Sequence, residues 1–443
     1  MAGSIHNLST DLDHTVESDL AIGTFNNALQ RRLIYGQSFD DVAVKNNDGE
    51  VFWRARKENA APTQDPVTPP SNDSIDSGHT AVYAKTEKWP VRLYRFGGMT
   101  KTNTAAAMVN FQDTYERDLE FIAGQAGATL DLQDRRTLNQ AYHGGCTNAS
   151  ETDSDSTLSS FDVYDTNGFT FSYVNGVRKS VSGSNTVAVY ITNTNDGTVL
   201  RQISAVVQGT RVDADDTIPG TITLTADIDA IAIGNLVKAV SCPPQLRPNG
   251  RTSPATIQAG DKLDFDTVVD AASYLGLNGV EPHQSTGMYH FLGDRTHFSS
   301  LWKSSAFREA YQGRYDSSEF RLGNRIECMG IMFDWTHNLA QSNNASGIKV
   351  RRALVTGEGI GERYFYEGEP NYLSKEIGPL FNQIHDPESH ITLTIRKPLD
   401  ANAEVFTTTW KSFTGRACTT DSLKNFGEHI YACFVRGVGI QTA

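Results

Sequence analysis

The chain has 443 residues, of which 38% are hydrophobic and 21% charged, so it is long enough for two or three domains and apolar enough to bury a core. This composition excludes a chain that is disordered throughout. The formal net charge of −13 excludes nucleic-acid binding by bulk electrostatics, because such binding needs Lys and Arg to displace counterions from phosphates.

The five cysteines are widely spaced, and none belongs to a CxxC or CxxH pair. This pattern predicts neither a zinc site nor a disulfide framework, so we expect reduced thiols in a chain made in a cytoplasm. Residues 1–20 are polar and acidic, which is unlike a secretory signal. No apolar run approaches the roughly 20 residues that cross a bilayer, so no membrane partner is expected.

Residues 1–48 have the pattern of an N-terminal arm, with one short amphipathic helix expected within residues 20–33. Residues 49–104 have the pattern of an extended β-hairpin. Strands are predicted at residues 50–57, 80–86 and 91–96, with a loop rich in Pro, Ser and Asp after the first and Pro90 between the last two.

Residues 105–145 carry the clearest helix signal. Apolar side chains recur at steps of three or four within residues 106–142, at Phe111, Tyr115, Leu119, Ile122, Ala126 and Leu130. Such a helix would be about 45–55 Å long at ~1.5 Å per residue. We expect Gly124 and Gly127 to let another backbone approach closely, and we expect the helix to end at the His-Gly-Gly sequence of residues 143–145.

Residues 146–242 change in character, because Asp, Ser, Thr, Asn and Gly dominate there. Short alternating runs are separated by turn signals such as the Asn-Gly of residues 175–176 and the Asp-Gly of residues 196–197. Such dipeptides between alternating runs are typical of β-hairpins. The segment therefore predicts a small inserted β-rich domain.

Residues 243–390 return to a mixed α/β pattern. Asp264 and Asp294 are candidate helix N-caps, and strands are predicted at residues 288–292, 325–335 and 353–356, with Gly330 breaking the second. Residues 391–443 predict three more strands, at residues 391–395, 405–410 and 430–436. The predicted fold class is therefore α+β.

No nucleophile elbow, HExxH helix, Walker loop or zinc-deaminase motif is present, so we expect no enzyme, no cofactor and no metal. The glycine-rich residues 357–361 lack the full phosphate-binding fingerprint, and Glu358 would repel a phosphate, so they are interpreted as a flexible turn. Two acidic groups lack the closing Glu of a calcium loop and are interpreted as solvated loops, with calcium as the weaker alternative. These groups are Asp153 with Asp155, and Asp213 with Asp215 and Asp216.

Three histidines, His283, His290 and His297, are seven residues apart but fall on a predicted loop, strand and helix. They are interpreted as ordinary surface or core histidines and not as metal ligands. Cys328 and Cys433 lie in apolar runs and are interpreted as small buried residues. The pair Arg351 and Arg352 is interpreted as solvated or interface charge.

The order of segments resembles that of the Hong Kong 97-type coat proteins of tailed bacteriophages. Three passages are similar to those of podophage-like members of that family: residues 288–311 (MYHFLGDRTHFSSLWKSSAFREAY), 322–336 (LGNRIECMGIMFDWT) and 349–361 (KVRRALVTGEGIG). The resemblance implies an N-arm at 1–48, an E-loop at 49–104, the spine helix of the P-domain at 105–145, an insertion at 146–242, mainly A-domain at 243–390, and return strands of the P-domain at 391–443.

The function implied by this resemblance is that of a major capsid protein. Such a protein self-assembles, as pentamers and hexamers, into an icosahedral head that encloses double-stranded DNA without sequence-specific contacts. It would be assembled in the host cytoplasm and located in the virion, where scaffolding, portal and decoration proteins are further partners. The candidate intersubunit contacts on the E-loop are Phe52, Trp53, Arg54, Trp89, Arg92, Tyr94 and Phe96.

Two other functions stay open at this point. The chain could be another virion protein, such as a tail or decoration component, with the β-rich insertion as its working part. It could also be a soluble carbohydrate-active enzyme that uses a pair of Asp or Glu side chains.

Overall fold

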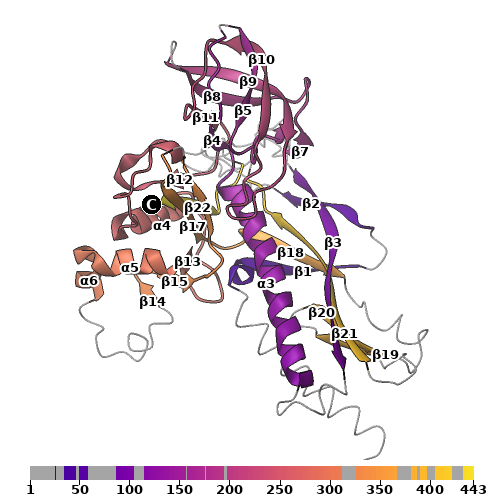
Figure 1. Ribbon diagram of the computed structural model, residues 1–443. Coiled ribbons are helices and arrows are strands. Elements are labelled where there is room, and N and C mark those ends of the chain that lie inside the picture. The colour runs from indigo at the N-terminus through magenta and orange to yellow at the C-terminus, as the bar shows by residue number, and fades with distance from the viewer. Residues whose placement is uncertain are drawn as a thin grey trace, which may run out of the picture.

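The computed structural model describes residues 25, 34–45, 49–57, 86–103, 114–155, 157–174, 176–193, 197–311, 326–344, 346–366, 381–386, 390–396, 405–421 and 433–443. Within these residues, three β-sheets and one long helix form the molecule, which confirms a mixed α+β class (Figure 1). None of the described helices combines the length and the apolar character needed to cross a membrane.

The largest sheet has nine strands and a central antiparallel pair of long strands. These two are β3 (Thr86–Asn103) and β21 (Val405–Cys418). The sheet order is β1-β18-β21-β3-β7-β6, with β2 beside β3 and with β20 beside β21 and β19. The remaining bounds are β1 Phe39–Val44, β2 Val51–Lys57, β6 Phe171–Val174, β7 Val177–Ser180, β18 Gly361–Tyr366, β19 Phe381–Asp386 and β20 Ile391–Arg396.

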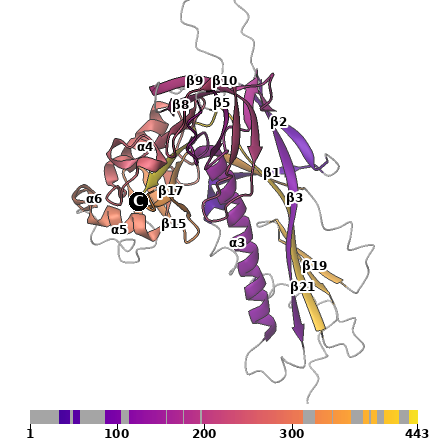
Figure 2. The same cartoon turned by 45° about the horizontal axis from the view of Figure 1, so that its top comes forward.

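Helix α3 (Thr114–Tyr142) runs along β3 and β21, and the three elements stay side by side in both views (Figures 1 and 2). Its 29 residues correspond to about 43 Å at 1.5 Å per residue. The described part of the predicted apolar stripe is confirmed, because Leu119, Ile122 and Leu130 are buried in a cluster that includes Trp410 of β21. The helix ends at Tyr142, and Gly145 follows with φ 78°, as the His-Gly-Gly sequence predicts.

Strand β3 lies against α3 at Gly98. A Cβ placed on Gly98 would collide with the end of the Gln125 side chain on the helix and with the Trp410 ring on β21, so a larger residue would require both side chains to shift. Gly124 and Gly127 lie within an uninterrupted helix. The start predicted at residue 106 and the side chains of Phe111 and Tyr115 lie outside the described residues, as do the strand residues 80–85 and most of the N-terminal arm.

The second sheet lies within residues 146–242 and closes on itself. Its order is β4-β11-β8-β9-β10-β5, all antiparallel. The backbone N–H of Ser150 donates to Asp162 O at 2.9 Å, and that of Tyr164 donates to Asn148 O at 3.1 Å, which joins the two outer strands into a small barrel. Its strands are β4 Cys146–Asn148, β5 Leu158–Val163, β8 Val187–Asn193, β9 Gly197–Gln208, β10 Gly220–Ile228 and β11 Leu236–Ala239.

The insertion is nevertheless divided between two sheets. The hairpin of β6 and β7 leaves the barrel and joins the nine-stranded sheet, where Lys88 pairs with Val177 and donates its backbone N–H to Gly176 O at 2.8 Å. Residues 171–180 therefore connect the barrel to strand β3.

The third sheet has seven strands with helices packed against it. The order is β12-β22-β17-β13-β15-β14, with β16 beside β17. Asp264 and Asp294 accept backbone N–H bonds from Thr267 at 2.8 Å and from His297 at 2.9 Å, which confirms both N-caps. The elements are α4 Phe265–Leu277, α5 Arg295–Lys303, α6 Ser305–Tyr311, β12 Gln245–Leu246, β13 Tyr289–Gly293, β14 Ile326–Cys328, β15 Ile331–Trp335, β16 Ala340–Asn343, β17 Lys349–Thr356 and β22 Gly437–Thr442. Short 3-10 turns lie at η1 Tyr35–Ser38, η2 Pro248–Gly250 and η3 Pro254–Thr256.

Three predicted features differ from the structure. Pro90 does not separate two strands, because it lies inside β3 opposite Trp53 of β2. The last strand is β22, beginning at Gly437, whereas residues 433–436 form no strand. Strand β22 pairs with β17 in the seven-stranded sheet, and β18 belongs to the nine-stranded sheet, so the predicted boundary at residue 390 does not separate the two sheets.

Candidate functional site

The hairpin of β2 and β3 has two unlike faces. Directly paired residues of antiparallel strands share a face, and the next pair along the strands lies on the other face. Arg54 pairs with Trp89, and that face turns inward, where Trp89 and Val91 are both 1% exposed. Trp53 pairs with Pro90 on the opposite face, and Trp53 is 55% exposed.

The inward face accounts for three of the proposed intersubunit contacts. Trp89 is part of the chain's own core, so its prediction as a contact with another subunit is corrected. Phe52 packs edge-on against Tyr364 with ring centroids 5.4 Å apart. Arg54 forms an ion pair of 3.3 Å with Glu362.

Phe96 lies farther along β3 and is also engaged within the chain. It is half-buried against the apolar cluster between α3 and the nine-stranded sheet, and the Arg416 guanidinium lies 5.7 Å from its ring centroid. Phe96 therefore offers a neighbouring subunit less free apolar surface than the exposed rings of the hairpin.

The outward face carries an exposed apolar surface beside an exposed cation. Val51, Trp53 and Tyr94 are each more than half exposed, and the Arg92 guanidinium lies 5.3 Å from the centroid of the Tyr94 ring. We call these four residues the hairpin patch. Val51 was missed by the sequence prediction, although its alternation with Trp53 places both side chains on the same face.

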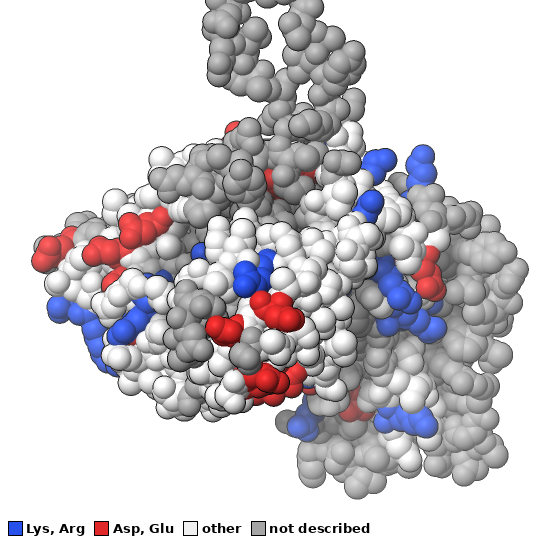
Figure 3. Space-filling view, turned by 90° about the horizontal axis from the view of Figure 1, so that it is seen from above, with Lys and Arg blue, Asp and Glu red and all other residues white. Residues whose placement is uncertain are grey.

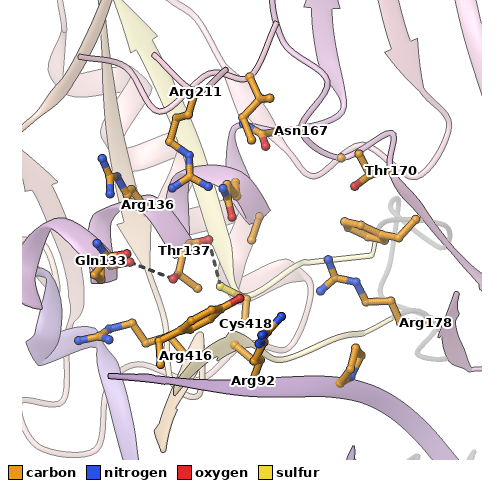
Figure 4. Close-up of a pocket in the computed structure, with 18 of the residues that line it drawn as sticks. Arg92, Gln133, Arg136, Thr137, Asn167, Thr170, Arg178, Arg211, Arg416 and Cys418 are labelled. Atoms are coloured by element: carbon orange, nitrogen blue, oxygen red, sulfur yellow. Dashed lines mark hydrogen bonds between the residues drawn. The ribbon is translucent and has the colours of Figure 1, made fainter. Parts of the chain in front are cut away.

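A pocket of about 670 Å³ lies next to the base of this hairpin. It is walled by α3, β3, the end of β21 and the segments that connect the barrel to the rest of the chain (Figure 4). Six arginines line it, and none of its described lining residues is an Asp or a Glu. The carboxylate pair that glycoside hydrolysis uses is therefore not found in this pocket.

Asp215 and Asp216 are buried, so their interpretation as part of a solvated loop is corrected. Asp216 accepts hydrogen bonds from Nε and Nη2 of Arg135 at 2.9 and 3.0 Å and from Asn139 at 2.9 Å. Asp213 is exposed and pairs with Arg136 at 2.5 Å. Within the described residues, no group of three or more His, Cys, Asp or Glu side chains is arranged to hold a metal ion.

The other acidic group, Asp153 and Asp155, does lie in a surface loop. Asp155 is exposed, and its backbone N–H donates to the Asp153 carboxylate at 3.0 Å. This geometry fits the interpretation of a solvated loop. Residues 357–360 form the turn between β17 and β18, with Gly359 at φ 65°, and Gly361 begins β18.

The three predicted histidines are all buried core residues. The rings of His283 and His290 lie 4.3 Å apart, and each bonds to a threonine. Burial lowers the pKa of His283 below its ordinary value. His297 instead closes the capping box of α5 with Asp294. Cys328 and Cys433 are buried, as predicted.

The two neighbouring arginines differ from each other. Arg351 pairs with Asp294 at 3.1 Å. Arg352 is 8% exposed and lies 3.7 Å from Asp165, so its interpretation as a solvated charge is corrected. Burial raises the pKa of Asp165 to about 6, although Arg352 opposes that shift.

Surface charge is unevenly distributed around the molecule. Seen from the barrel end, mainly basic side chains gather at the right, where β2 and β3 lie in Figure 1, whereas acidic and basic side chains occur together at the left and in the centre (Figure 3). The exposed basic side chains of β3 include Lys88, Arg92 and Arg95, and helix α4 exposes Asp266 and Asp270.

No protein-family model and no curated protein sequence matches the chain. Among solved structures, it is similar to the capsid of Ralstonia phage GP4, with a TM-score of 0.47 and 11% identity over 93% of this chain and 91% of that one. It is similar to the capsid asymmetric unit of cyanophage Pam1, with a TM-score of 0.47 and 9% identity over 91% and 88% of the two chains. It is also similar to the capsid of cyanophage P-SCSP1u, with a TM-score of 0.45 and 9% identity over 93% and 88%.

Proposed function

We propose that this chain is the major subunit of an icosahedral phage head that encloses double-stranded DNA. The observation that carries the proposal is the hairpin patch, in which aromatic rings stay exposed on an arm whose other face buries Trp89 and Val91 in the chain's own core. Exposed apolar surface of this kind on a folded chain marks a site of protein association. In a shell, that surface would lie on a neighbouring copy.

The size of the patch suits a weak contact that is repeated many times. A buried Trp or Tyr side chain removes about 150–250 Å² from water, and about half of that area is still exposed at Trp53 and Tyr94. Burying the rest on a neighbour would contribute about 2 kcal/mol per ring. Contacts of this strength let subunits rearrange during assembly and still hold a closed shell together when each copy meets several others.

The helix α3 offers a matching surface on the neighbour. Phe121 is 73% exposed on the outer side of this helix, whereas the adjacent Ile122 is buried on the inner side. We infer that the hairpin patch of one copy packs over the α3 region of the next, as an E-loop over the spine helix of a P-domain. The seven-stranded sheet with its helices would then form the A-domain at the centre of pentamers and hexamers.

The arrangement accounts for the division of the inserted segment. The barrel would stand on the P-domain as an additional module, while its β6–β7 hairpin braces strand β3 at Lys88. Scaffolding, portal and decoration proteins would be further partners, and the enclosed DNA would be held without sequence-specific contacts.

The test is assembly of the purified chain, followed by negative-stain electron microscopy and sedimentation velocity. We expect the wild-type protein to form rings or closed shells as its concentration rises. The double variant Trp53→Ser with Tyr94→Ser should remain as single subunits with an unchanged melting temperature, because both side chains are exposed in the subunit.

The matched control is Leu200→Ser, which removes an apolar side chain that is 51% exposed on the barrel strand β9. This variant should assemble like the wild type. A wild-type protein that stays monomeric at every concentration and salt tested would contradict the proposed function. Normal assembly of the double variant would contradict the role of the hairpin patch.

A further inference from the structure

The pocket beside the hairpin concentrates positive charge from separate parts of the chain. Its arginines come from β3, α3, β7, the segment after β9, and β21 (Figure 4). They are Arg92, Arg95, Arg136, Arg178, Arg211 and Arg416. The wall has no lysine either, so the cations are all guanidinium groups, which bind phosphate or carboxylate through two parallel hydrogen bonds.

Only part of this charge is compensated within the described residues. Arg416 pairs with the buried Asp134, and Arg136 pairs with Asp213 at 2.5 Å. Arg211 has no carboxylate within ion-pair distance among the residues that the structure describes. The same holds for Arg178, which instead stacks 3.8 Å from the centroid of the Phe171 ring.

Arg211 lies in a partly buried place close to a second guanidinium group, that of Arg136. Burial, followed by the Arg136 charge, lowers the pKa of Arg211 below its ordinary value, although Asp216 and Asp213 oppose that shift. Nε of Arg211 and Nη2 of Arg416 are buried without a hydrogen-bond partner in the described residues, and the Arg416 side chain is only 4% exposed. A buried donor without a partner disfavours the folded state, so an anion that accepts hydrogen bonds from these groups would stabilise the chain.

We propose that this pocket binds a small ligand that carries two or more phosphate groups. Several guanidinium groups facing one space need more than a single negative charge, and adjacent phosphates supply it at the right density. The neutral wall residues Gln133, Asn167 and Gln208 add amide groups to the lining, although Asn167 and Gln208 each donate one hydrogen bond within the chain. The volume of about 670 Å³ lies within the range of about 300–1,000 Å³ that is usual for small-molecule sites.

The pocket suits a compact ligand better than a DNA strand. It is a concave space between α3, β3 and the barrel connections, whereas nonspecific DNA binding uses open basic surfaces that follow the phosphate backbone. A ligand here would also join the barrel to the nine-stranded sheet, because Arg211 follows barrel strand β9 and Arg416 lies on β21. Ligand binding is therefore expected to stabilise the folded chain.

The experiment measures binding to the full-length protein by calorimetry and by thermal unfolding. The probes are pyrophosphate, tripolyphosphate and ATP, and sulfate at equal ionic strength is the control for general salt effects. We expect one site per chain, a saturable rise in melting temperature, and no such rise with sulfate. If all three probes bind equally, the protein recognises the phosphate chain alone. If ATP binds more tightly, the protein also recognises the base and the ribose.

Variants connect the binding to the pocket. Arg211→Gln and Arg178→Gln should each weaken pyrophosphate binding by a factor of ten or more. Without ligand, Arg211→Gln should melt at the wild-type temperature or above it, because it removes a repelling charge; a merely structural arginine would give a lower temperature. Lys238→Gln, at an exposed lysine of barrel strand β11 outside the pocket, should bind like the wild type.

Three results would overturn the proposal. The first is no saturable response to any polyphosphate. The second is a response that Arg211→Gln and Arg178→Gln retain in full, which would place the anion elsewhere. The third is that the wild-type protein binds a single-stranded oligonucleotide but not pyrophosphate, and that Arg211→Gln and Arg178→Gln abolish the oligonucleotide binding. That result would make the pocket a nucleic-acid site.

Discussion

Arg135 and Asp216 form a buried, two-pronged ion pair that connects helix α3 to the barrel. Nε and Nη2 of Arg135 donate to the two carboxylate oxygens at 2.9 and 3.0 Å, and the side chains are 4% and 0% exposed. Asp216 has φ 61°, a left-handed conformation that Asp and Asn tolerate better than most residues. Position 216 therefore requires both a negative charge, which neutralises Arg135, and a residue that tolerates a left-handed backbone.

We predict that the charge accounts for most of the contribution of Asp216 to stability. Asp216→Asn keeps the tolerated backbone but leaves Arg135 buried without its counter-charge, which typically costs about 3–5 kcal/mol. Asp216→Ala should cost more, because alanine also strains the left-handed backbone by about 1–2 kcal/mol. Urea unfolding of both variants measures the two effects. Asp213→Asn, at an exposed carboxylate, is the control and should change stability by less than about 1 kcal/mol.

The two tryptophans of the hairpin should respond in opposite ways to substitution. Trp89→Ala should destabilise the single subunit by about 3–5 kcal/mol, because it leaves a cavity in a filled core. Trp53→Ala should leave the stability of the subunit within about 0.5 kcal/mol, since more than half of this side chain is already in water. Denaturant unfolding of unassembled protein compares them, and an equal loss in both would contradict the assignment of the two faces.

Local signals in the sequence were sufficient for the elements that depend on neighbours along the chain. The apolar stripe of α3, the N-caps Asp264 and Asp294 and the break at Gly330 were all predicted and are all present. Each rests on residues a few positions apart, which is the range over which helix periodicity, capping and turn preferences act.

Strand β22 shows why the partners of late strands were not predicted. Its residues Gly437 and Gly439 weaken the strand pattern in the sequence. The apolar run before them led to the prediction of a strand at residues 430–436. A Cβ at Gly437 would lie 3.0 Å from the Tyr142 ring, and one at Gly439 would lie 2.9 Å from the His143 ring. Glycine is required at both positions because the strand packs closely against the end of α3. The residues in contact are some 295 positions apart, so no local sequence pattern indicates this packing.

The arginine pocket had no sequence signal for a similar reason. Arg136 and Arg416 are distant in sequence and meet only because α3 lies on β21. The alternation of side chains along the strands predicts that the hairpin has an outward face. The pairing register decides which tryptophan is buried, and it was not predicted because Pro90 was expected to end a strand.

Gly168 should be among the least replaceable residues of the inserted segment. Its φ is 83°, and a Cβ would collide with the backbone of Gly144 and Gly145 just beyond α3. Gly168→Ala should therefore cost more than the roughly 1–2 kcal/mol of left-handed strain alone. Gly183→Ala is the matched control, because a Cβ there meets no atom within 4 Å, and its stability should equal or slightly exceed that of the wild type. Similar melting temperatures of the two variants would contradict the packing at Gly168.

We expect the buried His143 to make the folded chain less stable in mild acid. It is 1% exposed beneath β22, and burial together with the Arg352 charge holds its pKa well below the ordinary value. The unfolded chain binds a proton at this residue as the pH falls through about 6.5, whereas the folded chain does not. The stabilisation that the neutral ring provides is therefore complete above pH 6.5 and decreases below it, by at most about 1.4 kcal/mol per pH unit.

Other titratable groups also change the free energy of unfolding as the pH falls, in the same or in the opposite direction, so the test compares variants. His283 acts in the same direction, because its pKa is also lowered by burial. Burial raises the pKa of Asp131 to about 6, so this carboxyl stabilises the fold as the pH falls and acts in the opposite direction. Urea unfolding from pH 7.5 to 5.5 should show a shallower decline in His143→Gln than in the wild type. His337→Gln, at an exposed histidine, should retain the wild-type decline, and an unchanged slope in His143→Gln would show that the buried ring is not its source.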